Sequence, residues 1–321
     1  MRHKFRYTLR RNRKKWLSQL VATLFLLFLA LNGLCFIAAY GLTHYKEPGQ
    51  WSIARPKPTS LQVPSQMGLR YQTRRIVLES PGDRSQWLDV WDIPLSRSKA
   101  SQGTVLMFPG IGGTKGTQLL PSAKVFHDLN YDTVLVDFLG VGESSGTRMT
   151  VGYREGEDVA AVLKDAQKQK LQPPFILYGI SMGSAAVLKA IALDQAQPDA
   201  VILELPYARL VNAVRSRFQV FGVPSFPLCE MTLFWGGVQH GFNALAHNPV
   251  EYARSVTVPT LVLQGERDPW TPPSEIQDIM TALRGEKFLT IVPDAGHGLL
   301  VTVDLSLWTQ SVKQFLSRSK K

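Results

Sequence analysis

Residues 177–185 read LYGISMGSA and place one serine, Ser181, between two glycines directly after a short apolar run. Gly-x-Ser-x-Gly between a strand and a helix is typical of a nucleophile elbow, in which the serine occupies a sharp, strained turn. The flanking Gly179 and Gly183 suit such a turn because larger side chains would collide with the neighbouring strand and helix. The pentapeptide alone is a weak signal, so its surroundings decide whether Ser181 is a nucleophile or only a turn residue.

Around this stretch, short apolar runs alternate with segments of helical period. Near-continuous apolar runs of strand length, typical of strands covered on both faces, occur at residues 105–108, 134–136, 175–178, 201–203, 261–263 and 288–292. Residues 159–166 and 308–316 instead carry apolar side chains at helical spacing. The alternation predicts a doubly wound α/β domain with a mostly parallel sheet. Two earlier runs, 76–78 and 87–93, flank a turn and predict an antiparallel hairpin at one edge.

Ligands of such sheets bind beyond the carboxyl ends of the strands, so the candidate functional residues are those that follow the strands. Asp268 follows the run at 261–263, and His297 follows the run at 288–292. A serine hydroxyl is a poor nucleophile unless a base takes its proton, and that base needs an orienting carboxylate. The chain order Ser181, Asp268, His297 is the one expected for this triad on an α/β sheet.

Other acids near strand ends compete for the orienting role. Glu204 ends another apolar run, while Glu266 and Asp294 lie in the same loops as Asp268 and His297. These three acids remain alternatives to Asp268.

The glycine-rich loop PGIGGTKG at residues 109–116 resembles a phosphate cradle. A Walker loop requires Ser or Thr after its lysine, whereas Lys115 is followed by Gly116. In the dinucleotide fingerprint a third glycine stands where this loop has Lys115. The spacing therefore argues against a nucleotide site.

Three motifs together resemble the signatures of the α/β-hydrolase superfamily in their usual order: GISMG at 179–183, GERD at 265–268 and GHG at 296–298. The resemblance covers residues 70–318. It implies an α/β-hydrolase fold, with a mostly parallel central sheet flanked by helices and a short lid insertion.

The same resemblance implies a role for each site residue. Ser181 would be the nucleophile, His297 the general base and then the general acid, and Asp268 the group that orients His297. The backbone N–H groups of Met182 and Ile111 would form the oxyanion hole. No metal or organic cofactor is expected.

The N-terminal 45 residues differ in composition from the rest. Residues 1–15 contain eight Lys and Arg and no acid, and residues 16–45 contain no charged side chain, although the whole chain carries a net charge of +11. The uncharged stretch is long enough to cross a hydrocarbon core of about 30 Å as a helix. We expect a basic cytoplasmic tail, a single-pass anchor, and a catalytic domain on the outer (periplasmic, extracellular or lumenal) side. A cleaved signal peptide is the alternative.

The charge is concentrated at the N-terminus, and the rest of the chain is close to neutral. Nucleic acid is therefore not an expected partner. Cys35 lies in the apolar stretch and Cys229 in the later domain, so the two should lie too far apart for a disulfide.

Residues 46–68 are rich in Pro, Gly, Ser and Gln and predict a linker, followed by a hydrolase domain at 69–321 with a lid at about 205–258. As a flexible coil, this linker would hold the site about 25 to 30 Å from the bilayer. The lid is rich in aromatic residues. We expect four of them to line an apolar substrate pocket, namely Phe218, Phe221, Phe234 and Trp235. The alternative is that these rings only pack against the domain.

The basic N-terminus, single span and compact domain resemble the membrane-anchored acylglycerol-lipase or serine-peptidase-like branch of the superfamily. The predicted function is a membrane-bound serine hydrolase that cleaves carboxylic esters or thioesters, with a small acyl ester and the lipid membrane as partners. A serine peptidase of the same fold is one alternative. A ligand-binding protein without turnover is another, because a fold alone does not fix function. The sequence carries no prediction of the oligomeric state.

Overall fold

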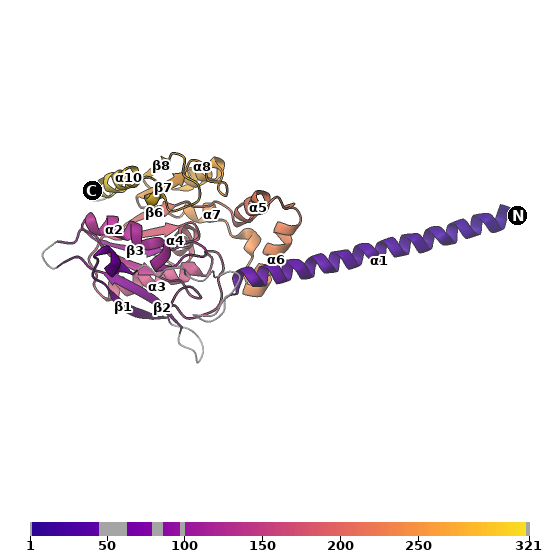
Figure 1. The fold of residues 1–321 in the computed structure, drawn as a ribbon, viewed down its shortest axis with the longest axis horizontal. Coiled ribbons are helices and arrows are strands. Elements are labelled where there is room, and N and C mark those ends of the chain that lie inside the picture. Colours follow the sequence, from indigo (N-terminus) through magenta and orange to yellow (C-terminus); the bar gives the residue numbers. More distant parts are fainter. Residues whose placement is uncertain (1, 45–62, 79–85, 97–99, 319–321) are drawn as a thin grey trace.

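The computed structural model describes residues 2–44, 63–78, 86–96 and 100–318, and the side chains from residue 15 onward. A long helix, α1 (Arg2–Thr43), projects from an α/β body (Figure 1). The predicted linker falls mostly outside the described residues. Its last part contains a 3₁₀ turn, Pro64–Met67.

The described residues form an eight-stranded sheet in the order β1-β2-β4-β3-β5-β6-β7-β8. From β4 to β8 all neighbours are parallel, whereas β2 runs antiparallel to β1 and β4. This confirms the predicted mostly parallel sheet and the antiparallel edge pair. The strands are β1 (Gln72–Leu78), β2 (Gln86–Ile93), β3 (Thr104–Phe108), β4 (Asp132–Val136), β5 (Phe175–Ile180), β6 (Ala200–Glu204), β7 (Thr260–Gly265) and β8 (Lys287–Val292).

Helices cover both faces of the sheet, which is why the central strands are apolar throughout. Alternate residues of one strand reach opposite cores: Leu106 joins one cluster, and Val105 and Met107 join the other. One core contains residues of α3 (Glu155–Lys168), α4 (Met182–Leu193), α7 (Pro249–Ala253) and α8 (Pro273–Ala282). The other core contains residues of α2 (Leu120–Asp128), α9 (Leu300–Val303) and α10 (Leu305–Arg318).

Between β6 and β7 the chain forms α5 (Leu210–Val220) and α6 (Leu228–His240), within the segment predicted as a lid. A third apolar cluster fixes these helices to the body through Tyr207, Leu210 and Leu233, which pack with Ala185 of α4. The lid is therefore connected to the helix that follows the elbow.

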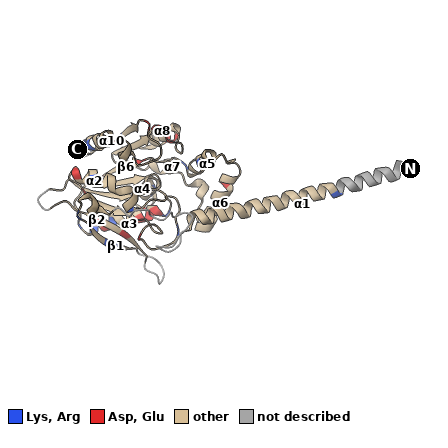
Figure 2. Ribbon diagram, viewed as in Figure 1, with Lys and Arg blue, Asp and Glu red and all other residues tan. Residues whose placement is uncertain are grey.

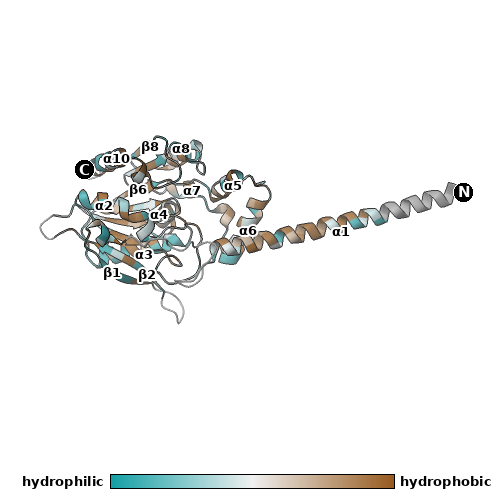
Figure 3. Ribbon diagram, viewed as in Figure 1, coloured by the Kyte–Doolittle hydropathy of each residue, from teal (hydrophilic) through white to brown (hydrophobic). Residues whose placement is uncertain are grey.

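Helix α1 is apolar over Lys15–Thr43 and, among the described residues, is the one helix long and apolar enough to cross a membrane. Past Lys15 it carries no charge (Figure 2) and is predominantly hydrophobic (Figure 3). Its C-terminal end packs against α6 rather than standing apart from the domain (Figure 1). The length of the linker therefore does not set the height of the site above the bilayer, contrary to the expectation from the sequence.

The packing of α1 on α6 also brings Cys35 to the start of the helix that contains Cys229. Cys35 Sγ lies 4.0 Å from the backbone oxygen of Leu228, the neighbour of Cys229 in sequence. Both cysteines are free thiols, and Cys229 Sγ instead donates to the backbone oxygen of Val211 on α5, at 3.4 Å.

Candidate active site

Ser181 stands in a strained turn between β5 and α4. Its backbone has φ 51° and ψ −107°, a left-handed conformation that non-glycine residues rarely adopt. A side chain on Gly179 would collide with the backbone of Gly183, and one on Gly183 would lie 2.5 Å from the carbonyl oxygen of Phe108. The two glycines are thus required by the close approach of α4 to β5 and β3.

Hydrogen bonds to the neighbouring strand hold this turn. Ser181 N donates to the backbone oxygen of Glu204 at the end of β6, at 2.7 Å. Ser184 Oγ donates to the oxygen of Gly179 at 2.6 Å and lies 3.1 Å from that of Glu204. Because these partners are buried backbone atoms, the turn is fixed before any ligand binds.

The structure brings Ser181, His297 and Asp268 together from the loops after β5, β8 and β7. His297 Nε2 lies 3.0 Å from Ser181 Oγ, and His297 Nδ1 lies 2.7 Å from Asp268 Oδ2. Ser181 is 6% exposed and Asp268 8%. In this geometry the imidazole can accept the serine proton at one nitrogen while the carboxylate holds the other.

Three N–H groups donate hydrogen bonds to the Asp268 carboxylate in addition to its contact with His297. Its Oδ1 accepts from Trp270 N at 2.9 Å and Thr271 N at 3.2 Å, and its Oδ2 accepts from Gln264 Nε2 at 2.9 Å. Burial alone would raise the pKa of Asp268, but the hydrogen bond and charge of His297, together with these donors, hold it below its usual value. The carboxylate therefore stays ionised at neutral pH, and its contribution to stability is lost only as the pH falls through that lowered pKa.

Among the described residues, the imidazole is hydrogen-bonded to Asp268 and to none of the three alternative acids. Glu204 is fully buried and accepts from Tyr178 Oη at 2.7 Å, Trp308 Nε1 at 2.9 Å and Leu300 N at 3.0 Å, so it ties β6 to α9 and α10. Glu266 accepts from the backbone N–H of Asp294. Asp294 pairs with Arg267 at 2.5 Å, and both side chains are mostly exposed.

The glycine-rich loop after β3 approaches Ser181, because a side chain on Gly110 would lie 3.3 Å from Ser181 Cβ, and the next residue, Ile111, lines the same cavity as Ser181. Met182 is the first residue of α4, where backbone N–H groups have no partner within the helix. Gly110 N donates to Gln118 Oε1 at 2.7 Å and fixes the start of the loop. The loop and the start of α4 thus both border the turn that holds Ser181.

Lys115, which gave this loop its resemblance to a phosphate cradle, points into the protein. Its Nζ lies 2.5 Å from Asp137 Oδ2 and 2.8 Å from Asp89 Oδ1, and the residue is 2% exposed. Asp137 also accepts from Lys115 N and Glu143 N. The lysine therefore anchors the loop to β2 and β4. Sequence reasoning missed this because the two acids come from distant strands.

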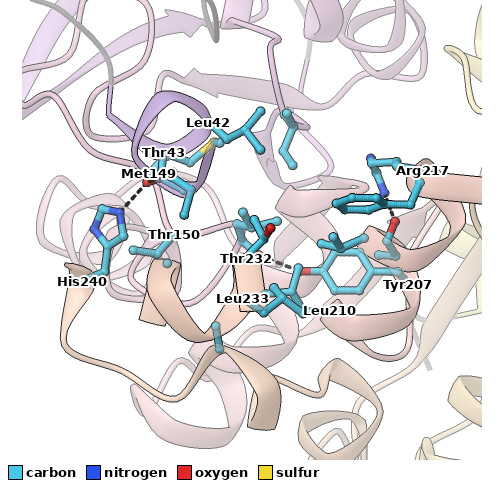
Figure 4. A pocket seen from close by; sticks show the side chains of 18 of the residues that line it. Leu42, Thr43, Met149, Thr150, Tyr207, Leu210, Arg217, Thr232, Leu233 and His240 are labelled. Atoms are coloured by element: carbon cyan, nitrogen blue, oxygen red, sulfur yellow. Dashed lines mark hydrogen bonds between the residues drawn. The ribbon is translucent and has the colours of Figure 1, made fainter. Parts of the chain in front are cut away.

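Ser181 opens onto a cavity of about 380 Å³, within the size range of small-molecule sites. Apolar side chains of the lid form much of its wall, among them Leu210 and Leu233 (Figure 4). Phe218 and Phe221 of the lid line it as well. The placement of Phe218 and Phe221 agrees with the expected pocket.

Phe234 and Trp235 correct that expectation, since neither is among the described residues that line the cavity. Trp235 packs edge-on against Phe36 of α1, with ring centroids 5.5 Å apart, and its Nε1 donates to Asn32 Oδ1. Phe234 is 53% exposed. The helical period of α6 turns these two rings toward α1 and outward, while Leu233 faces the cavity.

Arg217 of α5 also lines the cavity, and sequence reasoning did not single it out. Its guanidinium lies 4.5 Å from the centre of the Trp270 ring. The centroids of the Trp270 and His297 rings are in turn 4.7 Å apart. Arg217 Nη1 donates to the oxygen of Ala213 at 2.6 Å, and no described acid lies within ion-pair distance of it. His240 is the other titratable base among the described residues that line the cavity. Burial lowers the pKa of His240 to about 4, so its side chain is neutral at pH 7. Among the described lining residues, Arg217 is thus the one that carries a charge at pH 7.

Two families match consecutive parts of the chain. Residues 99–234 match the family described as "serine aminopeptidase, S33", and residues 239–321 match the family described as "PhoPQ-activated pathogenicity-related protein". The first part contains Ser181, and the second contains Asp268 and His297.

The individual proteins to which the chain is similar share low sequence identity with it. The chain is 25% identical over 204 residues to an uncharacterized protein of Bacillus subtilis, covering 62% of this chain and 67% of that protein. It is 25% identical over 185 residues to lysophosphatidylserine lipase ABHD12 of Danio rerio, covering 54% of this chain and 45% of that protein. The structure of an esterase from Pyrococcus furiosus aligns with a TM-score of 0.67 at 20% identity, covering 85% of this chain and 98% of that one. This likeness confirms the predicted fold class.

Proposed function

Because the chain is an α/β hydrolase with an apolar N-terminal helix, we propose that it is a serine hydrolase that cleaves carboxylic esters through an acyl-enzyme on Ser181. One observation carries the proposal: Ser181, His297 and Asp268 are hydrogen-bonded in series at the wall of an apolar cavity. The strain stored at Ser181 supports it, because a turn residue without a role would not need such a conformation.

The reaction follows from these positions. His297 Nε2 takes the proton of Ser181 Oγ as the oxygen attacks the ester carbon, and Asp268 stabilises the imidazolium that forms. The N–H groups of Met182 and Ile111 would hold the oxyanion. His297 then protonates the leaving alcohol, the carbon–oxygen bond breaks, and the acyl group remains on Ser181. Water, deprotonated by His297, then attacks the acyl carbon, the bond from that carbon to Ser181 Oγ breaks, the acid leaves, and His297 returns the proton to Ser181 Oγ. Thioesters would follow the same path.

A serine aminopeptidase is the second candidate, because one matching family has that description. An aminopeptidase must hold the ammonium of its substrate, for which a carboxylate is the usual partner. The described residues that line the cavity include Arg217 but no Asp or Glu. Esters therefore fit this cavity better than peptides with a free N-terminus. A panel of p-nitrophenyl esters and aminoacyl amides tests the choice: we expect ester turnover, and turnover of the amides alone would favour the peptidase.

Arg217 further favours substrates with a negative charge, since a cation with no acidic partner among the described residues is available to an anionic group. We expect Arg217→Met to lower kcat/KM for a lysophosphatidylglycerol at least about tenfold more than for the monoacylglycerol with the same chain, because charge-assisted hydrogen bonds contribute about 1.5–3 kcal/mol. Arg215→Met is the matched control, because Arg215 lies on the same helix but pairs with Glu230 at 2.7 Å. Equal losses on both substrates would contradict the charge preference.

The apolar stretch of α1 and the basic residues before it also support a single-pass anchor with the catalytic domain on the outer side. We expect the chain to stay in the membrane fraction after an alkaline carbonate wash. In intact cells or spheroplasts, protease added outside should cleave the hydrolase domain. Cleavage only after the membrane is broken would reverse the orientation, and release by the wash would favour a processed leader.

A further inference from the structure

The end of α1 forms part of the wall of the candidate active site. Ala39, Leu42 and Thr43 line the same cavity as Ser181. Ala39 is 2% exposed, whereas Leu42 is 55% exposed and therefore lies where the cavity meets the outside. Figure 4 shows Leu42 and Thr43 on one side of the cavity and Leu233 on the other. The apolar N-terminal helix is thus part of the site as well as a potential anchor.

Specific contacts fix α1 in this position. Hydrogen bonds connect its last turns to α6 and to the body of the domain: Trp235 Nε1 to Asn32 Oδ1 (3.2 Å), Gln239 Nε2 to the Phe36 oxygen (2.9 Å), His240 Nε2 with Thr43 Oγ1 (2.7 Å), and Met149 N to the Thr43 oxygen (2.9 Å). Cys35 and Ala39 are buried at the same contact. The wall is therefore held by directional bonds, so Leu42 keeps a defined place at the cavity.

The helix geometry sets the depth of this contact in a bilayer. A hydrocarbon core of about 30 Å is crossed by roughly 20 helical residues at 1.5 Å each. Counted from Trp16, where the charge-free stretch begins, the core ends near Cys35. The residues that line the cavity, from Ala39 to Thr43, then lie at the level of the outer headgroups. Trp235, which contacts Asn32 and Phe36, lies near the end of the core, and Tyr40 lies at the headgroup level; aromatic rings with a polar group are favoured in this interfacial region.

The lid carries exposed apolar side chains on α6, which packs against this end of α1, and on the end of α5 and the segment between the two helices. We call these side chains the lid apolar surface; it comprises Val220, Phe221, Val223, Phe226, Phe234 and Val238, each at least 40% exposed. Contiguous exposed apolar surface marks an interaction site. Because α6 packs against a helix that would be surrounded by lipid, the bilayer is the occupant that continuity with α1 favours (Figure 1).

We infer that the cavity opens to the outer leaflet beside Leu42, that the acyl chain of a lipid ester enters there along α1, and that Leu42 and Ala39 determine the chain length accepted. The inference rests on the proposed function and names its substrate class, a membrane-resident ester with a single apolar chain. The anchor is then a specificity element of the enzyme, and the substrate reaches Ser181 without leaving the membrane.

The test uses the full chain in phospholipid nanodiscs and p-nitrophenyl esters from acetyl to hexadecanoyl. The measured quantity is kcat/KM for each ester divided by that for acetyl. We expect Leu42→Trp to lower the relative kcat/KM for the dodecanoyl ester at least about tenfold. The larger ring would exclude part of the acyl chain from the cavity, and each methylene that is no longer buried lowers kcat/KM roughly fourfold. Leu42→Ala should move the optimum to longer chains. Ile37→Trp is the control, because Ile37 lies on α1, is 67% exposed and is not among the described residues that line the cavity. Its dependence of relative kcat/KM on chain length should match that of the wild type.

Unchanged profiles in both Leu42 variants would overturn the inference, as would an equal change in Ile37→Trp. Failure of the proposed function is distinguishable, because the wild type would then hydrolyse no ester, including acetyl. Thermal unfolding identifies a variant that has lost its fold.

A second measurement does not depend on any substitution. A fluorophosphonate with a twelve-carbon chain and a terminal diazirine is added in phosphatidylcholine vesicles, and the cross-linked peptide is identified by mass spectrometry. We expect cross-links to residues 34–43. Cross-links confined to the domain at 69–318 would show that the chain end never reaches α1 and would overturn the inference.

Discussion

Replacement of Ser181 by alanine is expected to lower kcat for ester hydrolysis by about 10⁴- to 10⁶-fold, the usual loss when a nucleophile that acts with a base is removed. The physical reason is that His297 Nε2, 3.0 Å from Ser181 Oγ, then has no hydroxyl to deprotonate. Initial rates on the best p-nitrophenyl ester, with enzyme purified in parallel, measure the loss.

The fold should survive this change, because the backbone bonds that hold the turn are made by Ser181 N and by Ser184 rather than by the Ser181 hydroxyl. The midpoint of thermal unfolding should therefore stay within a few degrees of the wild type. Turnover near the wild-type level in a folded Ser181→Ala protein would remove the serine mechanism from the account.

Asp268→Asn should be nearly as severe, with a loss of about 10⁴ in kcat, because an amide facing His297 favours the wrong tautomer of the imidazole. Asp268 Oδ2 lies 2.7 Å from His297 Nδ1, and that nitrogen must carry the proton for Nε2 to accept one from serine. The test measures kcat of the wild type and of Asp268→Asn at several pH values, on samples with the same folded fraction.

Asp294→Asn is the matched control for Asp268→Asn. Asp294 precedes His297 by three residues but is mostly exposed and pairs with Arg267, so kcat should change little. Glu204→Gln should instead affect stability, because Glu204 accepts from three buried donors. If Glu204→Gln lowered kcat more than Asp268→Asn at equal folded fraction, the orienting acid would be Glu204.

The sheet and the positions of the candidate triad could be predicted from sequence because their signals are local. Strands buried on both faces must be continuously apolar, and the elbow needs its glycines where α4 approaches β5 and β3. The chain order of Ser181, Asp268 and His297 follows from the parallel topology, which brings the ends of β5, β7 and β8 to one edge. No long-range contact has to be known for these steps.

The cavity wall could not be predicted in the same way. Which aromatic residues of α6 face the cavity depends on how that helix packs against α1, and Phe234 and Trp235 face away from it for that reason. A charge-free helix gives no sign in its sequence of which side contacts protein, apart from isolated small or polar residues such as Asn32 and Ala39. Lys115 was equally hidden, since its acidic partners come from other strands.

The most direct test of the central claim is the location of a fluorophosphonate adduct in the full-length protein. The probe reacts with a serine hydroxyl that a neighbouring base activates. Tryptic mass spectrometry should find the adduct on Ser181, and the rate of labelling should fall with the rate of ester hydrolysis in Asp268→Asn. An adduct on another residue would contradict the assignment of Ser181 as the nucleophile. Rapid ester hydrolysis by protein that stays unlabelled after prolonged treatment with the probe would contradict it as well.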